Sequence, residues 1–368
     1  MTTEVSSVRG PSGVSVVICC HNSAKLLPQT LAHLKRQRVS GDLEWEVLLI
    51  DNASSDETAA VARRCWGDDG PAPLRIVHES HLGLSYARER TLREARYDII
   101  GFVDDDNWVS DSWVAAIADT FDREPQLGAL GSLVYPSFEA TPPAWWHEYG
   151  PDYFALTLEP TPAPIYIKGA GMAIRKVAWQ ALYEGGFRSR LIGRKGKALS
   201  GGEDNELTMA LRLSGWKLAV SPGLQMQHFM PSQRLQWNYL RKLVRGYAAA
   251  HVLLEAYTEH SMSLGAPKSI VSDRWWYQLA RTTKQLASQP RLVVAALSSE
   301  EGKAEVLEFE KLFGKAIGLL RSRGRYGLSR RTVRVAHWRQ PDQLNGSDGP
   351  QRRQESYQYD GAAEVANR

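Results

Sequence analysis

Short apolar runs alternate with helix-like segments over residues 14–220 of this chain. The runs are rich in Val, Ile and Leu and are bounded by polar turns, a pattern typical of buried strands in a parallel sheet. Between them, apolar positions recur every three or four residues, as at Leu27, Leu31 and Leu34, which predicts amphipathic helices. The expected strands span residues 14–20, 45–50, 74–77, 99–103, 127–134, 165–175 and 216–220.

The expected helices lie between these strands, at 23–36, 57–65, 83–95 and 113–121, and another helix opens at Glu203. Ser23 is the expected N-cap of the first helix. Repeated alternation of strand and helix indicates an α/β protein with a doubly wound, mostly parallel sheet. The first strand is not followed by Gly-x-Gly-x-x-Gly, and no Gly-Lys-Ser/Thr phosphate loop occurs, so an ordinary dinucleotide fold is disfavoured.

The alternation stops at two places. Residues 136–164 are rich in proline and aromatic residues, which predicts a long irregular loop acting as a lid or binding loop. Trp145 and Trp146 in this loop fit either stacking on a ligand or plain packing. From Ser232 the chain becomes helical, with further helices expected at 274–297 and 300–321. We therefore expect a flexible N-terminus at 1–13, an α/β domain at 14–230, a helical appendage at 231–337 and a disordered tail at 338–368.

Composition indicates a globular protein and gives no sign of nucleic-acid binding. The apolar fraction of 43% is ordinary for a soluble globular protein, and the net charge of +4 is too small to argue for nucleic acid. Three cysteines, Cys19, Cys20 and Cys65, lack metal-type spacing and are expected to be reduced, as in a cytoplasmic protein. No signal peptide is expected, and no apolar run approaches the roughly 20 residues of a membrane helix, so any membrane contact should be peripheral.

A basic cluster near the C-terminal end of the predicted helices has two interpretations. It fits a solvated surface, and it also fits contact with anionic lipid headgroups. Both remain open from the sequence. The cluster consists of Arg321, Arg323, Arg325, Arg330, Arg331 and Arg334.

The candidate chemistry begins at the acidic end of the strand at 99–103. Asp104, Asp105 and Asp106 follow this strand directly, at the sheet edge where open α/β proteins bind ligands. Three adjacent carboxylates repel one another unless a cation lies beside them, and a hard divalent ion prefers oxygen ligands. The alternative is a solvated acidic turn.

Polar residues follow other strands at the same expected edge. Asp51 ends the strand at 45–50, which suggests a contact to a nucleobase or ribose, whereas Ser55 and Asp56 are explained by helix capping alone. The helix that starts near Gly83 would favour an anionic ligand through its free N–H groups. Arg88, one turn into that helix, either adds charge to the pocket or lies on the surface.

Two later segments add further candidates. A loop rich in glycine and lysine, containing Lys195 and Lys197, leads into Glu203 and Asp204 at a helix start. Acids in a first helical turn are ordinarily partners of the helix dipole. His228 follows the last predicted strand in a polar segment, where a metal or phosphate role competes with a structural one.

Taken together, these motifs resemble the family 2 glycosyltransferases of the GT-A fold, over residues 14–228. The resemblance implies that Asp51 contacts the nucleobase of a nucleotide-sugar donor, and Asn22 and Ser54 are further donor-binding candidates. One motif departs from the family: Gln236 stands where its processive synthases carry the arginine of Gln-x-x-Arg-Trp, here Gln233 to Trp237, which argues against a processive synthase. The motifs that carry the resemblance are 14–23, 50–56, 104–106, 169–172 and 202–204.

The resemblance and the residue types together suggest an inverting glycosyltransferase. Asp106 and Asp104, with His228, would hold Mg²⁺ or Mn²⁺, which neutralises the departing diphosphate. Asp204, beside Glu203, would be the base that takes the acceptor proton. Donor-binding residues would also include Asp105, Arg88, Lys195 and Lys197, the two lysines closing over the diphosphate.

Partners and alternatives follow from this hypothesis. The expected partners are a nucleotide-sugar donor, most simply a UDP-sugar, and a carbohydrate or lipid-linked acceptor in polysaccharide or glycoconjugate biosynthesis. A nucleotidyltransferase should carry a basic glycine-rich loop after the first strand, where this chain has His21-Asn22-Ser23. A catalytically silent binding module would bind nucleotide sugars without turnover. The sequence fixes neither the sugar, nor the acceptor, nor the oligomeric state.

Overall fold

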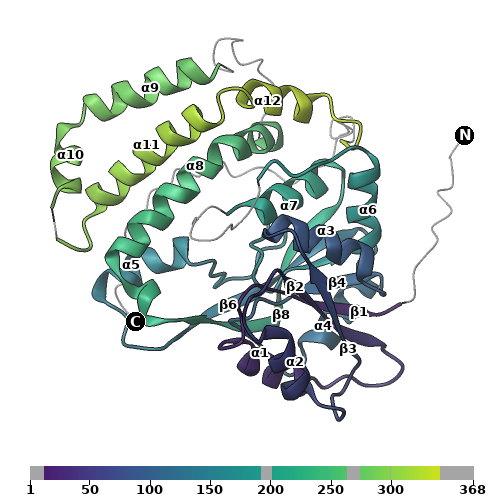
Figure 1. The fold of residues 1–368 in the computed structure, drawn as a ribbon. Coiled ribbons are helices and arrows are strands. Elements are labelled where there is room, and N and C mark those ends of the chain that lie inside the picture. The colour runs from purple at the N-terminus through teal and green to yellow at the C-terminus, as the bar shows by residue number, and fades with distance from the viewer. Residues whose placement is uncertain (1–11, 192–200, 263–273, 299, 340–368) are drawn as a thin grey trace, which may run out of the picture.

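The structure, a computed structural model, describes residues 12–191, 201–262, 274–298 and 300–339. Four predictions therefore lie wholly or largely outside the described residues: the roles of Lys195 and Lys197, the flexible N-terminus and the disordered tail. The described chain forms a sheet flanked by helices, followed by a separate group of helices (Figure 1). This arrangement confirms the predicted α/β fold with a helical appendage.

One sheet of eight strands organises the first part of the chain, in the order β3-β2-β1-β4-β7-β6-β8-β5. β1 pairs in parallel with β2 and β4, and β2 pairs in parallel with β3. β7 is antiparallel to β4 and β6, and β5 is antiparallel to β8, so the sheet is mixed but mostly parallel. The strands are β1 (Val14–Cys20), β2 (Trp45–Asn52), β3 (Leu74–Glu79), β4 (Ile99–Phe102), β5 (Asn107–Val109), β6 (Leu127–Phe138), β7 (Ala173–Arg175) and β8 (Lys217–Met230).

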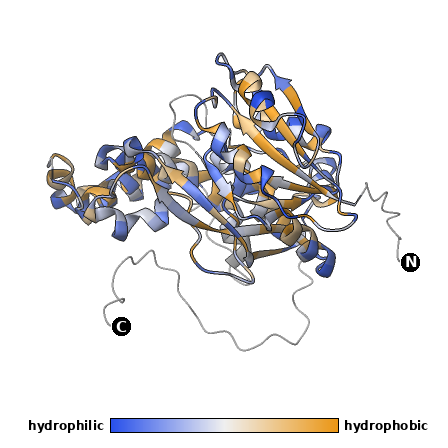
Figure 2. Cartoon of the chain, turned by 90° about the horizontal axis from the view of Figure 1, so that it is seen from below, coloured by the Kyte–Doolittle hydropathy of each residue, from blue (hydrophilic) through white to orange (hydrophobic). Residues whose placement is uncertain are grey.

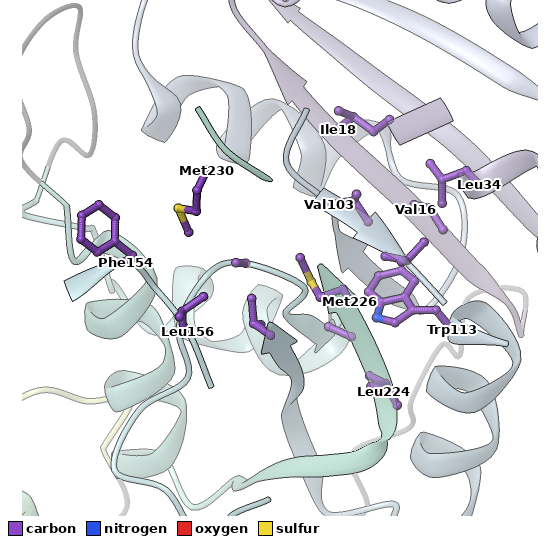
Figure 3. Close-up of a cluster of buried hydrophobic side chains, with 14 of the residues drawn as sticks. Val16, Ile18, Leu34, Val103, Trp113, Phe154, Leu156, Leu224, Met226 and Met230 are labelled. Carbon is purple, nitrogen blue, oxygen red and sulfur yellow. The ribbon is translucent and has the colours of Figure 1, made fainter. Parts of the chain in front are cut away.

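Helices cover both faces of this sheet. Alternate residues of a strand point to opposite faces, so each buried strand contributes side chains to the packing on both sides. Val16 and Ile18 of β1 pack with Leu34 and Trp113 in one cluster, which Figure 3 shows, whereas Val17 belongs to a second cluster on the other face. The central strands β1, β2 and β4 are accordingly mostly apolar, and much of the sheet is orange in Figure 2. The helices of this part are α1 (Leu27–Lys35), α2 (Thr58–Trp66), α3 (Leu84–Glu94), α4 (Trp113–Arg123), α5 (Ala144–Tyr153), α6 (Lys176–Glu184) and α7 (Glu203–Leu213).

The helical appendage is built on a long helix, α8, which packs along α11. α9 and α10 pack on α11, and α12 packs on α8 (Figure 1). Within the described residues, no helix is both long and apolar enough to cross a membrane. The elements are the 3₁₀ helix η1 (Ser232–Leu235), α8 (Trp237–Met262), α9 (Trp275–Ala287), α10 (Pro290–Ala296), α11 (Ala304–Arg321) and α12 (Tyr326–Arg334).

The strand predicted at 165–175 is wrong over most of its length, since only Ala173–Arg175 pairs as β7. The preceding segment is held instead by side chains of α7: the N–H of Ile167 donates to the Thr208 hydroxyl at 3.0 Å, and the N–H of Gly169 donates to Asp204. Gly171 has φ of +66°, which ends the extended conformation. Tertiary contacts therefore replaced the ladder that the alternating sequence predicted.

The loop predicted at 136–164 is also more regular than expected. β6 continues to Phe138, and α5 begins after Pro143. Trp145 and Trp146 are buried, with their rings against Trp237 and Phe138 respectively, so plain packing is the correct interpretation of this pair. The aromatic residues join the appendage to the sheet rather than forming a stacking platform.

Two smaller predictions were wrong. Ser23 does not cap α1, which begins at Leu27; the Ser23 carbonyl accepts from the N–H groups of Leu26 and Leu27 in a preceding turn. His228 lies inside β8 rather than in a polar segment after the last strand. The three cysteines are free thiols, as expected.

Candidate active site

A cavity of about 810 Å³ opens at the carboxyl ends of β1 and β4, between the sheet and helices α8 and α11. This is the edge at which parallel α/β sheets bind ligands. Many predicted site residues line this one cavity although they are far apart in sequence. They are Arg88, Asp104, Asp105, Asp106, Glu203, Asp204 and His228.

Asp106 contacts two basic side chains. Its side chain is buried, and Oδ2 lies 2.9 Å from Nη2 of Arg234 and 3.4 Å from Nε2 of His228. The pairing of β5 with β8 causes this approach, because it places His228 directly opposite Asn107. Nη1 of Arg234 also lies 3.0 Å from Nε2 of His228, so the guanidinium bridges the two side chains.

Asp105 titrates differently from an exposed carboxyl. Burial, followed by the negative charge of Asp106, raises the pKa of Asp105 to about 7. The Asp104 N–H donates to Oδ1 of Asn107 at 3.1 Å, which closes the turn that carries all three acids. A raised pKa means that Asp105 binds its proton more tightly. The protonated carboxyl carries no charge, so the expected repulsion among the three acids is partly relieved.

The residues around Asp106 suit a divalent cation in their chemistry. Carboxylate oxygen and imidazole nitrogen are donors that Mn²⁺ accepts, and carboxylates suit Mg²⁺. Over the described part of the chain, no group of three His, Cys, Asp or Glu side chains is arranged to hold a metal ion. Arg234 engages the donor atoms of both Asp106 and His228. A cation therefore fits here only when the guanidinium withdraws.

Asp204 is held at the start of α7 by two backbone groups. The Gly169 N–H donates to Oδ2 at 2.5 Å, and the Asn205 N–H donates to Oδ1 at 2.9 Å. A Cβ atom at Gly169 would lie 2.9 Å from Oδ2 of Asp204 and 3.0 Å from Nη2 of Arg88. A side chain at this position would therefore push against the Asp204 carboxylate, in agreement with the close approach that the sequence Gly169-Ala170-Gly171 suggested.

Arg88 and Glu203 form a buried pair beside Asp204. Nη1 of Arg88 lies 3.3 Å from Oε1 of Glu203, and the guanidinium lies 5.6 Å from the centre of the Phe102 ring. Burial lowers the pKa of Arg88, but the charges of Glu203 and Asp204 outweigh it and raise that pKa. Arg88 is thus a cavity residue and not a surface arginine.

The three residues predicted to contact the nucleotide lie together next to the cavity but do not line it. The Asn22 N–H donates to the Ser54 hydroxyl at 3.0 Å, and the Ser54 N–H donates to Oδ1 of Asp51 at 3.3 Å. Their neighbours His21 and Asn52 do line the cavity. The geometry thus brings Asn22, Asp51 and Ser54 into one loop cluster at its rim.

Arg234 and Lys168 are among the cavity residues that the sequence did not point to. Arg234 lies within the segment Gln233 to Trp237. In that segment the family motif singles out only position 236, where this chain has glutamine instead of arginine. Lys168 immediately precedes the glycine segment, and burial lowers its pKa, against the opposing charges of Asp152 and Asp204. No local pattern marks either residue, because both acquire their surroundings only through the fold.

Comparison with known proteins gives a consistent result. The family described as "Glycosyl transferase family 2" matches residues 15–182. Succinoglycan biosynthesis protein ExoM of Rhizobium meliloti is 26% identical over 248 residues, which is 66% of this chain and 75% of that protein. The glucosyl-dolichyl phosphate glucuronosyltransferase of Haloferax volcanii is 24% identical over 37% of this chain and 42% of that protein.

A solved structure has a similar fold. The mannosyltransferase PcManGT of Pyrobaculum calidifontis, solved in complex with GDP-Man and Mn²⁺, superposes with a TM-score of 0.50 at 16% identity, covering 87% of this chain and 88% of that one. At that identity the likeness concerns the fold alone, and it agrees with the sheet described above. This chain is a glycosyltransferase that belongs to family 2 and has the GT-A fold.

Proposed function

We propose that the enzyme transfers a sugar from a nucleoside-diphosphate sugar to an acceptor hydroxyl, with inversion at the anomeric carbon. One observation carries the proposal: Asp106 and Asp204 line the same cavity although they lie on different elements. A single displacement needs one site that binds the departing diphosphate and one separate base, and these two acids can serve those roles.

Asp106, Asp104 and His228 are the residues that would hold the divalent cation. When bound, Mg²⁺ or Mn²⁺ would neutralise the charge that develops on the departing diphosphate. Arg234 has to leave Oδ2 of Asp106 first, since it lies 2.9 Å away. A guanidinium released in this way remains at the cavity wall, where it suits an anionic group.

Asp204 is the proposed base. Its carboxylate accepts two backbone N–H bonds, which fix its orientation before the acceptor arrives. The acceptor O–H would give its proton to Asp204 as its oxygen bonds to the anomeric carbon and the bond from that carbon to the diphosphate breaks. Arg88, which is paired with Glu203, lies beside this group and adds a positive charge to this part of the cavity.

The donor and acceptor classes come from the loops around the cavity and from the relatives. Asn22, Asp51 and Ser54 would contact the nucleobase or ribose, and Lys195 and Lys197 would contact the diphosphate. A UDP-sugar is the simplest donor, although PcManGT was solved with GDP-Man. The names of the ExoM and Haloferax proteins support a carbohydrate or lipid-linked acceptor in polysaccharide or glycoconjugate biosynthesis.

The first prediction tests Asp204 directly. A panel of nucleoside-diphosphate sugars with Mn²⁺ identifies the donor, first by protection of the protein against heat and then by its slow hydrolysis. Asp204→Asn should lower hydrolysis and transfer at least ~100-fold, because the amide accepts no proton, and leave donor affinity within about threefold. Asp119→Asn, on the exposed side of α4, is the matched control. Transfer at near wild-type rate by Asp204→Asn would remove the assignment of the base.

A further inference from the structure

The outer side of α9 and α10 exposes large apolar side chains. Trp276 is 52% exposed and Leu297 is 85% exposed, and Tyr277, Val293 and Val294 are exposed as well. Each helix turns other residues inward, since Thr282 of α9 and Leu292 of α10 are buried. The exposed apolar residues therefore lie on the side that is not used for packing within the chain.

The same two helices carry charge of only one sign. Residues 274–298 contain no Asp or Glu, and their four cations, Arg274, Arg281, Lys284 and Arg291, are all exposed. The ion pairs found in the described helical region use other cations. The acids that follow have partners of their own: Glu300 pairs with Lys303, and Glu301 accepts from the indole of Trp145.

The position of these helices leaves that side open. α9 and α10 both pack on α11, and α11 in turn packs on α8. In Figure 1 they form the edge of the molecule farthest from the sheet, and Figure 2 shows apolar and polar segments next to each other at that end. We define the outer face as the exposed residues Arg274, Trp276, Tyr277, Arg281, Lys284, Arg291, Val293, Val294 and Leu297.

We propose that the outer face binds the surface of a lipid bilayer that contains anionic lipids. Amphipathic helices that lie in a bilayer surface combine Trp and other apolar side chains, which enter the boundary of the acyl chains, with Lys and Arg, which meet lipid phosphates. An ordinary protein partner would present both signs of charge, and a face without acids complements a surface of one sign. This surface is separate from the arginine cluster at 321–334, in which Arg330 is buried against Glu255.

The outer face is linked to the cavity through one helix. α11 packs against α9 and α10, and its residues Lys311, Leu312 and Lys315 line the cavity. Binding to a bilayer would thus fix the cavity at one height above the lipid surface. The inference goes beyond the proposed function and does not depend on it, because lipid binding is measured without donor or acceptor.

The experiment measures flotation of the full chain with vesicles. Vesicles of phosphatidylcholine alone are compared with vesicles in which half the lipid is phosphatidylglycerol, at 0.1 M and 0.5 M NaCl. We expect binding to the anionic vesicles that weakens at high salt. The double variant Trp276→Ser/Leu297→Ser should lower the partition coefficient about tenfold or more, and so should Arg281→Gln/Lys284→Gln.

Controls separate this surface from the alternatives. Leu158→Ser/Val177→Ser removes exposed apolar residues from the α/β part of the chain and should leave binding unchanged. Circular dichroism and thermal unfolding check that each variant is folded. The proposal is overturned if the wild-type chain does not float, if only Arg331→Gln/Arg334→Gln abolishes flotation, or if Trp276→Ser/Leu297→Ser removes self-association in light scattering while leaving lipid binding intact.

Discussion

Arg234 occupies the atoms through which Asp106 and His228 would bind a cation. Its Nη2 lies 2.9 Å from Oδ2 of Asp106, and its Nη1 lies 3.0 Å from Nε2 of His228. All three side chains are largely buried, where an uncompensated charge is costly. The guanidinium of Arg234 balances the negative charge of the Asp106 carboxylate there. Binding of a divalent cation and retention of this ion pair are therefore competing events.

A second prediction follows from that competition. Arg234→Gln removes the competing charge, so the affinity of the donor-free protein for Mn²⁺ should rise about tenfold, corresponding to ~1.4 kcal/mol. Titration calorimetry or the electron paramagnetic resonance signal of free Mn²⁺ measures it. Arg38→Gln, an exposed arginine of the sheet domain, is the control. Unchanged or weaker Mn²⁺ binding by Arg234→Gln would show that Arg234 does not compete with the cation.

Gly169 provides the third prediction. An added Cβ would lie 2.9 Å from Oδ2 of Asp204, the oxygen that accepts the hydrogen bond from the Gly169 N–H. Gly169→Ala should displace the carboxylate and lower the transfer rate by at least ~10-fold, as misplacement of a reacting group by about 1 Å does.

The matched control for Gly169→Ala is Gly41→Ala, which has no atom within 4 Å of the added carbon and whose cost is therefore confined to its backbone conformation. Thermal unfolding distinguishes a change in activity from a change in fold. Full activity of Gly169→Ala would mean that this contact does not position the base.

At the scale of elements, the contact between α8 and α11 decides how the appendage is held. Two glycines of α11 allow the helices to approach: a Cβ at Gly314 would lie 2.4 Å from the carbonyl oxygen of Arg245, and one at Gly318 would lie 2.4 Å from that of Ala249. Glu310, fully buried between the same helices, is bound by Arg241 at 2.9 Å and Arg245 at 2.6 Å. Helix propensity thus favours alanine over glycine at these positions, whereas the close packing of α8 on α11 favours glycine.

The fourth prediction uses that conflict. Helix propensity alone predicts that Gly318→Ala stabilises the protein by up to ~1 kcal/mol. The clash with backbone of α8 predicts instead that it lowers the free energy of unfolding by about 1–3 kcal/mol. Gly324→Ala, where the added carbon meets nothing within 4 Å, serves as control. Chemical denaturation decides between the two, and stabilisation by Gly318→Ala would contradict the close packing of α8 and α11.

At the scale of the whole molecule, a partly buried ion-pair network joins α8 and α11, which line the cavity, to α12. Glu255 of α8 is bound by Lys315 of α11 at 2.8 Å and by Arg330 of α12 at 2.9 Å. Burial raises the pKa of Glu255, but the charges of Lys315 and Arg330 outweigh it and hold that pKa below its usual value of 4.5.

The fifth prediction concerns acid stability. Because the pKa of Glu255 is lower in the folded state, its contribution is fully present above the unfolded pKa of 4.5 and is lost as the pH falls through the folded value. Glu255→Gln should lower the free energy of unfolding by ~3 kcal/mol at pH 7. The difference between wild type and variant should shrink below pH 4.5, where the wild-type carboxyl takes up its proton. Asp105, whose pKa is raised to about 7, acts in the opposite direction in both proteins and cancels in the comparison.

A difference that stays constant from pH 7 to pH 3 would contradict the role of this charge. Urea denaturation at a series of pH values gives the measurement. Glu57→Gln, which breaks an exposed pair with Arg64, is the control and should cost less than ~1 kcal/mol at every pH.

The sequence by itself determined most of the strands and helices of the α/β part and their order, although not β5, α5 or α6. The apolar runs at 14–20 and 45–50 became β1 and β2 with at most two residues of difference, because a strand buried on both faces needs an unbroken apolar segment. The acids at 104–106 lie at the sheet edge because they follow β4 after a single residue, Val103. Motif order sufficed to suggest the family, which the comparisons then established.

Only the tertiary structure decided which side chains meet. The pairing of β5 with β8 brought His228 to Asp106, and η1 brought Arg234 to both. Contacts with α7 kept residues 165–172 from forming the strand that their alternation predicted. The reason is physical: periodicity records whether a residue faces the core within its own element, whereas contacts between distant residues depend on how those elements are stacked.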